Sequence, residues 1–422
     1  MTDAGDDQPA GDVLTGQLAG QTIGDGLIVL PGQGNSLAAV TDAGVVVLDV
    51  SGNQHTKPML ATLREHTQAP IHAIVFSHGH LGYNSAVDRW VDHNDERGDP
   101  PPRRIAHANL VKRNARYRET LELQARLASM QFPTPVPVET LMAVLAIHDP
   151  TETFDDRLLL VDGARRVELL WAPSEVDDAL AMWLPDDGLL CGGAATPGPS
   201  IPNIGTPLRT QRFTVRWADT LDRLDRLGAD RLMTEFGAVI EGADNVHRQL
   251  SLTSEALRWL REQVVERMNR GMGEGEILAD ITYPSELFDH PWMRPVYGDP
   301  DYIVRDLYRE ENGWWDRNPT TLHPAPPDAA AAAVLSAITD RAAVVARARE
   351  LAEAGDTQLA LHVIDVLALA PGDDEHVVAA RELKRRLCRD RHDQVPSFVS
   401  RSLYRTSAQR LKEGQLSWTH LP

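Results

Sequence analysis

The sequence predicts a sheet-rich α/β domain followed by an all-α region. Short runs of apolar, β-branched residues separated by Gly and Asn fill residues 26–52, and further runs of this kind then alternate with helical patterns as far as residue 236. From about Asp244 onwards the strand patterns stop and helical periodicity remains. Strands that first meander and then alternate with helices are typical of a sheet domain with helices packed outside it.

The elements of the α/β part follow one another closely. Strands are expected at residues 26–32, 36–44, 44–52, 70–78, 103–108, 157–163, 166–173, 180–188, 189–193 and 230–236. Helices are expected where apolar residues recur at helical spacing, at 57–67, 84–93, 110–130 and 213–228.

The second half begins with a strongly amphipathic helix at 252–272, and a connector rich in Pro and aromatic residues follows it. Ala-rich helical stretches at 329–355, 356–372 and 373–391 resemble one or two tetratricopeptide-like hairpins, which usually make protein contacts. The chain is therefore expected to divide into four parts: a disordered acidic lead (1–20), the α/β domain (21–243), the helix and connector (244–326) and a helical domain (327–422).

The composition narrows the choice of partners. With 42 Lys and Arg against 61 Asp and Glu, the formal charge is −19, which argues against nucleic acid or an anionic membrane as the main partner. A small anionic substrate stays possible because one pocket can be locally positive. The N-terminus lacks the features of a signal peptide, no apolar run approaches the ~20 residues of a membrane span, and the two cysteines, Cys191 and Cys388, fit a reducing cytoplasm.

The stretch "SHGHLGYN", from Ser77 to Asn84, is the first candidate for chemistry. A His-x-His pair at the end of a strand points two imidazoles the same way, since strand side chains repeat with a period of two. A catalytic zinc takes three ligands from His, Asp or Glu and keeps one position for water, whose pKa falls toward ~7. Taken alone the pair is weak evidence, because two structural histidines can arise easily in a chain with 15.

Several further motifs make a metal site at this His-x-His pair the better interpretation. "AIVFSHGHLGYNSAV" resembles the HxHxDH loop of the metallo-β-lactamase fold, and "VVVLDVSG" places Asp49 where that fold commonly carries an Asp at a strand end. "MRPVYGDPDYIVRDLYREENGWWDRNPTTLHPAP", with the Ala-rich helices and "SRSLYRTSAQRL" after it, resembles the dimerisation region of the alkyl sulfatase group within this fold. With "PNIGTPLR" the resemblance covers residues 25–412. It implies an αββα sandwich, an all-α dimerisation domain and a homodimer formed through the C-terminal helices.

The resemblance also implies metal ligands, because members of that group carry two zinc ions. The first site maps onto His78, His80 and Glu175. The positions of the second site hold Gly82, Tyr83, Ala194 (or Gly193) and Phe236. Because only the ligands of one ion are lost, the pattern favours a site that has become mononuclear over one that has lost metal binding altogether. A re-formed second site would need Glu235, Asp177 or Asp178, although a carboxylate next to Phe236 is expected to point elsewhere.

The remaining site residues follow from the same resemblance. Asn203 and Arg209 in "PNIGTPLRT" match polar residues that grip the sulfate, and an arginine can form two parallel hydrogen bonds to an anion. A plain surface position is the alternative for Arg209. Asp49 would orient a ligand histidine without contacting the metal ion itself. Tyr83 would either donate a hydrogen bond to the substrate or fill the vacated pocket.

These observations together predict a cytoplasmic hydrolase with one zinc ion per chain, which activates water to cleave a sulfate ester or another small anionic ester. The metal-bound water is the nucleophile, and no protein base is assigned. Detergent-type alkyl sulfates are expected to be poor substrates, because no sterol-carrier-like third domain follows the helices in this sequence. Two alternatives stay open: an Fe(II) enzyme with two histidines and one carboxylate, and a catalytically inactive dimer.

Overall fold

The computed structural model describes residues 20–131 and 145–415, and they form two compact units. The first unit contains the described residues up to Gln124 together with 145–310, and the second contains 125–131 and 311–415. The expected acidic lead at 1–20 lies outside the described residues, apart from Gly20. The expected connector, 244–326, is shared between the two units.

The first unit contains two mixed sheets. The first sheet has the order β1 (Thr22–Gly24), β2 (Leu27–Pro31), β3 (Asn35–Thr41), β4 (Gly44–Leu48), β5 (Ile71–Val75), β6 (Arg103–His107) and β7 (Glu152–Phe154). The second has the order β13 (Ile240–Glu241), β12 (Arg231–Thr234), β11 (Leu189–Gly193), β10 (Leu180–Leu184), β9 (Val167–Trp171) and β8 (Arg157–Val161). The pairs β4–β5, β5–β6, β6–β7 and β11–β12 are parallel, and the other pairs are antiparallel.

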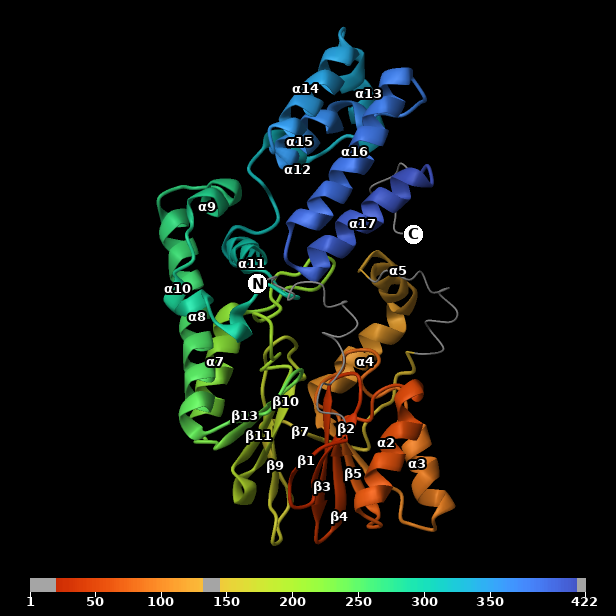
Figure 1. Ribbon diagram of the computed structural model, residues 1–422, viewed down its shortest axis with the longest axis vertical. Coiled ribbons are helices and arrows are strands. Elements are labelled where there is room, and N and C mark those ends of the chain that lie inside the picture. The colour runs from red at the N-terminus through yellow and green to blue at the C-terminus, as the bar shows by residue number, and fades with distance from the viewer. Residues whose placement is uncertain (1–19, 132–144, 416–422) are drawn as a thin grey trace, which may run out of the picture. The chain divides into compact units, whose positions relative to one another are not determined.

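The two sheets lie face to face, with helices on both outer sides (Figure 1). Helices α2 (Asn53–His66) and α3 (Val87–Glu96) cover the first sheet, while α7 (Thr214–Asp225) and α8 (Ala243–Asn269) cover the second. Val46 packs between the sheets and its neighbour Val47 packs under the helices, as the two-residue period of a strand requires. The expected αββα sandwich is therefore confirmed.

The expectation of one helix at 110–130 was wrong, because two helices lie there. Helix α4 (Asn109–Glu119) ends at Thr120, and α5 (Leu121–Gln131) begins directly after it. Both the N–H and the hydroxyl of Thr120 donate to the carbonyl of Arg116. The hydroxyl thus competes with the backbone N–H for this carbonyl at the residue where α4 ends.

The chain after α8 is helical throughout its described length. It contains α9 (Glu274–Asp280), α10 (Ser285–Phe288), a short 3-10 turn (Pro291–Met293), α11 (Pro300–Asn312), α12 (Pro319–Leu322), α13 (Pro327–Ser336), α14 (Arg341–Glu353), α15 (Thr357–Ala368), α16 (Glu375–Gln394) and α17 (Phe398–Lys412). Helices α14 to α17 pack in succession around one apolar core, which confirms the all-α character of the C-terminal region.

The expected helical stretch at 329–355 is bent. Helices α13 and α14 meet at an angle of 105°, and the Asp340 carboxylate caps α14 by accepting from the N–H of Ala343. In the described part of the chain no single helix is long and apolar enough to cross a membrane, and only this bent pair passes that test, by length and composition alone.

Candidate metal centre

The two histidines of the "SHGHLGYN" loop face one another directly after β5. Nε2 of His78 lies 2.9 Å from Nδ1 of His80, and the rings meet edge to face. The His78 side chain is fully buried, whereas that of His80 is 24% exposed. A substrate can therefore approach the pair from the His80 side.

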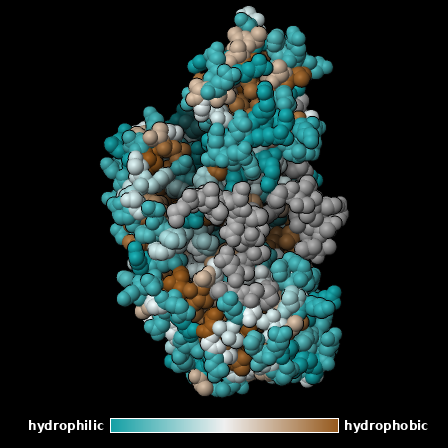
Figure 2. Space-filling view, in the orientation of Figure 1, coloured by the Kyte–Doolittle hydropathy of each residue, from teal (hydrophilic) through white to brown (hydrophobic). Residues whose placement is uncertain are grey.

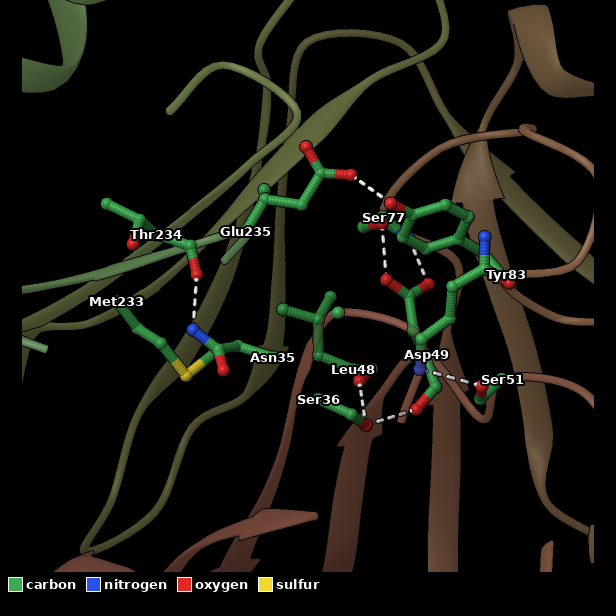
Figure 3. A pocket seen from close by; sticks show the side chains of 13 residues that line it. Asn35, Ser36, Leu48, Asp49, Ser51, Ser77, Tyr83, Met233, Thr234 and Glu235 are labelled. Atoms are coloured by element: carbon green, nitrogen blue, oxygen red, sulfur yellow. Dashed lines mark hydrogen bonds between the residues drawn. The ribbon is translucent and has the colours of Figure 1, made fainter. Parts of the chain in front are cut away.

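Asp49 and Ser77 fix the orientation of His78. The Asp49 carboxylate follows β4 and accepts from the Ser77 N–H at 2.9 Å and from the Ser77 hydroxyl at 2.5 Å (Figure 3). It also accepts from Asn84 Nδ2 at 2.6 Å. Ser77 Oγ also lies 2.8 Å from His78 Nδ1. Because the Ser77 hydroxyl gives its proton to Asp49, His78 must donate from Nδ1, which leaves a lone pair on Nε2 facing His80.

Burial raises the pKa of the Asp49 carboxyl to about 6, against the hydrogen bonds from Ser77 and Asn84, which lower it. Above that pH the carboxylate is charged and holds the arrangement described for His78. The backbone of Asp49 adopts φ +57°, a left-handed conformation that an Asp tolerates better than most residues and that lets the chain turn sharply at the end of β4.

Tyr83 and Glu235 form a second buried pair beside His78. The Tyr83 hydroxyl donates a short hydrogen bond to Oε1 of Glu235, and Figure 3 shows the two side chains pointing toward one another across the pocket. The Tyr83 ring centroid lies 4.3 Å from that of His78, and Glu235 Oε1 lies 4.0 Å from His78 Nε2. Burial and the charge of Glu175 raise the pKa of Glu235 to about 8.

The orientation of Glu235 corrects an expectation. A carboxylate next to Phe236 was expected to point away from the site, but β12 ends at Thr234, so strand alternation does not continue through these residues. Glu235 lines the small pocket with Tyr83, whereas Phe236 lines a separate, mostly apolar cavity of about 380 Å³ together with Trp292.

Glu175 lies on the other side of His80. Its Oε1 is 3.9 Å from His80 Nε2, accepts from Asn203 Nδ2 at 2.7 Å and lies 2.8 Å from Arg212 Nη2. Arg212 is only 4% exposed and also donates to the backbone carbonyl of Asn203. The carboxylate of Glu175 is thus already neutralised by a buried guanidinium.

The two predicted sulfate-gripping residues take different positions. Asn203 uses its amide nitrogen on Glu175, and its oxygen accepts from the Thr206 hydroxyl, so the side chain braces the loop. Arg209 is partly exposed and donates to the carbonyl of Leu208 at 3.2 Å. It nevertheless lies close enough to His80 for its charge to affect that ring.

Asp177 and Asp178 serve as partners of Arg113 in α4. Arg113 Nε donates to Asp178, and Arg113 Nη2 donates to Asp177 at 2.9 Å. Asp178 is fully buried and also accepts from the N–H of Gly79, between the two histidines, at 2.6 Å. A Cβ at Gly79 would lie 2.6 Å from Arg113 Cδ, so only glycine fits here.

Burial and positive neighbours keep both histidines uncharged. Burial lowers the pKa of His78 well below its usual value, with the neighbouring His80 as the next cause. Burial also lowers the pKa of His80 well below its usual value, and the charges of Arg212, Arg113 and Arg209 lower it further. Neutral imidazoles are the form that ligates metal ions.

The chain is similar to proteins of known activity. Residues 273–414 match the family model described as alkyl sulfatase dimerisation. A linear primary-alkylsulfatase from Pseudomonas sp. (strain ATCC 19151) is 26% identical over 389 residues, which cover 88% of this chain and 73% of the relative. The chain is therefore similar to the alkyl sulfatases over most of its length.

Two further alkyl sulfatases are similar to the chain. An (R)-specific secondary-alkylsulfatase from Pseudomonas sp. is 25% identical over 401 residues, which cover 88% of this chain and 59% of the relative. The solved structure of a stereoselective inverting secondary alkylsulfatase from Pseudomonas sp. has a TM-score of 0.78 at 21% identity, covering 93% of this chain and 65% of that one. The chain thus spans about three-fifths of the length of these two proteins.

In this chain, other groups fill the space of the expected second metal site. Gly82 adopts φ +98°, and a Cβ there would lie 2.7 Å from Oε1 of Gln33. Tyr83 and Gly193, at two of the vacated positions, line a pocket of about 10 Å³, which holds little more than one water molecule.

The donor atoms fit a metal ion only in part. Adjacent donors in a tetrahedral zinc site with bonds of about 2.0–2.1 Å lie roughly 3.3 Å apart. The 2.9 Å between the imidazole nitrogens is close to that value, and the 4.0 Å from His78 Nε2 to Glu235 Oε1 lies somewhat above it. Among the described residues no group of three His, Cys, Asp or Glu side chains is arranged so that it could hold a metal ion.

Sequence reasoning missed the roles of two buried arginines, Arg113 and Arg212. Arg113 stands in a basic cluster on α4 that looks like a solvated helix face, and Arg212 lies three positions beyond the arginine that matches the family motif. Charge alone gave no signal for either residue, because each is identified by the carboxylate it meets in the folded chain.

Proposed function

We propose that this protein is a metal-dependent hydrolase that cleaves a sulfate ester or another small anionic ester. The observation that carries the proposal is the pair of neutral imidazoles, His78 and His80, whose nitrogens face one another at 2.9 Å. The alkylsulfatase relatives support the reaction class, sulfuric ester hydrolysis. A zinc ion bound here would lower the pKa of its water toward ~7 and supply hydroxide near neutral pH.

His78 and His80 would hold the ion. Ser77 and Asp49 contribute by keeping the proton of His78 on Nδ1, so that Nε2 carries a lone pair without further rearrangement. Asp178 contributes by holding the backbone of Gly79, which fixes the separation of the two rings.

The buried arginines suit an anionic substrate. Arg212 lies close enough to His80 for its charge to lower the pKa of that ring, and its Nε is buried without a hydrogen-bond partner among the described atoms. A buried donor without a partner costs free energy that an anionic oxygen could recover. Arg113 and Arg209 add positive potential around the same ring. We therefore infer that the sulfate, or a group of similar charge, lies on the His80 side of the pair.

We also propose a homodimer formed through the C-terminal helices. The match to the dimerisation family model includes these helices. Large apolar side chains are exposed on α13, on α15 and the residue directly after it, and on α16, namely Val334, Leu359, Val366, Leu369 and Val378. On the face shown in Figure 2, hydrophobic areas are small and are separated by hydrophilic surface.

Release of sulfate tests the proposed reaction. Zinc-loaded protein should liberate sulfate from short-chain and polar sulfate esters, and His80→Ala should lose at least about a hundredfold in rate because one of two imidazole donors is gone. His66→Ala, at an exposed histidine near the end of α2, is the matched control and should keep full activity. Equal rates in wild type and His80→Ala would contradict the proposal.

A further inference from the structure

We propose that the cavity beside Phe236 and Trp292 is a second binding site, which takes a small amphipathic anion such as a medium-chain alkyl carboxylate. The inference goes beyond the proposed hydrolase function, because it concerns a different part of the first unit. It follows from the size of the cavity, from the chemistry of its lining and from side-chain polar groups there that no other described residue engages.

The cavity is too large to be a packing defect. It has a volume of about 380 Å³, and most of the residues that line it are apolar. Voids inside proteins are few and are seldom larger than a water molecule, whereas small-molecule sites have volumes of roughly 300–1,000 Å³. A space of this size and composition therefore favours a ligand.

The cavity is separate from the histidine pair. Within the described chain, only Thr234 lines both the cavity and the small pocket beside Tyr83. The described residues that line the pocket at His78 and His80 include none of the cavity wall. A molecule in the cavity would therefore leave both imidazoles accessible.

The backbone keeps the wall of the cavity in place. Gly198 and Gly237 lie in this wall and adopt φ +95° and +88°, which favour glycine. A Cβ at Gly198 would overlap the carbonyl oxygen of Phe236, so the two segments can approach one another only because this residue is glycine. The same carbonyl accepts from the Thr234 hydroxyl at 2.6 Å, which ties Phe236 to the end of β12.

Trp292 offers the cavity a hydrogen-bond donor that has no other use. Its ring is held by His290, which stacks on it with the ring centroids 4.7 Å apart and the planes 3° from parallel. The indole Nε1 is buried and has no hydrogen-bond partner among the described atoms. Because a buried unpaired donor costs free energy, a ligand oxygen that accepts from it would bind more tightly.

Two neighbouring residues of α8 give the lining its polar end. Gln249 is 7% exposed, and its side-chain amide has no hydrogen-bond partner among the described residues. Arg248 is exposed, is the one charged residue in the described wall and forms no ion pair with another described residue. An arginine can form two parallel hydrogen bonds to a carboxylate. The lining thus fits an apolar body that ends in one anionic group.

Calorimetric titration of the full chain with octanoate tests the site. Octanoate has the apolar body and the anionic end, octanol has the same chain without the charge, and acetate has the charge without the chain. We expect one octanoate per chain, binding of octanol that is weaker by at least about threefold, and no measurable binding of acetate. Equal affinities for octanoate and octanol, or no binding of octanoate, would overturn the proposal.

Three substitutions locate the bound octanoate. Ala238→Phe puts a large side chain at an exposed position of the cavity wall, Arg248→Glu reverses the charge, and each should lower the affinity at least about tenfold. Trp292→Phe keeps a ring but removes the N–H, and should lower the affinity about threefold. Arg89→Glu, at an exposed arginine on α3, is the matched control and should bind as wild type does. Octanoate binding that survives both Ala238→Phe and Arg248→Glu would contradict the assignment.

A further variant separates the cavity from the histidine pair. His80→Ala changes the proposed metal centre but no part of the cavity wall, so its affinity for octanoate should equal that of wild type. A loss of tenfold or more in this variant would show that octanoate binds at the histidines instead, as an analogue of the substrate, and would overturn the proposal.

Discussion

At the scale of single residues, Ser77 connects Asp49, which follows β4, to the histidine pair that would hold the proposed metal ion. Its N–H and hydroxyl both donate to Asp49, and its oxygen accepts from His78 Nδ1. One hydroxyl therefore decides which nitrogen of His78 carries a proton. A change at this position should affect metal binding without touching a metal ligand.

Ser77→Ala should lower zinc affinity by about 10–100-fold, because it frees the proton of His78 to move to Nε2. The measurement is a chelator competition titration on the metal-free protein. Ser251→Ala, at a half-buried serine on α8, is the control and should bind as wild type does. Unchanged affinity in Ser77→Ala would mean that Asp49 and Ser77 do not set the tautomer.

Asp49 should make the stability of the metal-free protein depend on pH. Its pKa is raised from 3.8 to about 6, so folding favours the protonated form. The stabilisation is fully present below about pH 4 and is lost as the pH rises through 6. Two pKa units limit the effect to roughly 1–3 kcal/mol.

Asp49→Asn should remove this part of the pH dependence, because the amide cannot ionise. Urea unfolding at pH 4 to 7 should show the free energy of unfolding of wild type falling relative to the variant across that range. Parallel curves for the two proteins would show that Asp49 does not titrate as its burial implies.

At the scale of elements, the sequence predicted most strands and the helices that cover the sheets, because apolar patterns repeat over five or more residues there. Strands β1, β7 and β13 escaped prediction, since two or three residues are too few to show alternation. The break at Thr120 also escaped, because it depends on a hydroxyl bonding back to Arg116 rather than on a Gly or Pro.

The site was predictable to the extent that one loop carries it. His78, His80 and Tyr83 lie within six residues, and the structure brings them together with Asp49 and Glu175. The placement of Glu235 was not predictable, because it depends on β12 ending at Thr234.

A single substitution that restores an Asp at position 82, in the loop between β5 and α3, should not rebuild the second metal site. Gly82→Asp puts a side chain at φ +98°, with its Cβ 2.7 Å from Gln33 Oε1. We expect a loss of roughly 1–3 kcal/mol in the free energy of unfolding. Denaturant unfolding measures the loss, and zinc analysis should find no additional ion. A stable variant with a second zinc would contradict the view that the pocket is filled.

At the scale of the whole molecule, the family match at 273–414 includes parts of both units, because the first unit extends to Glu310. The exposed apolar side chains on α15 and α16 belong to the second unit. The proposed dimerisation through these helices should therefore be changeable without altering the sandwich.

Val378→Asp with Leu359→Asp should convert the proposed dimer to a monomer, because each side chain is about half exposed and a buried carboxylate at an interface is unfavourable. Sedimentation velocity gives the mass. Leu159→Asp, at a 48% exposed leucine on β8, is the matched control and should leave the mass unchanged. A double variant that keeps the mass of wild type would place the interface elsewhere.

The most direct test of a single-metal centre is elemental analysis of untagged protein purified without added metal, beside His80→Ala. The account predicts close to one zinc per chain in wild type and a loss of that zinc in the variant. One iron per chain would instead indicate oxidative chemistry at the same histidines. Two zinc ions per chain, or no metal in either protein, would contradict the account.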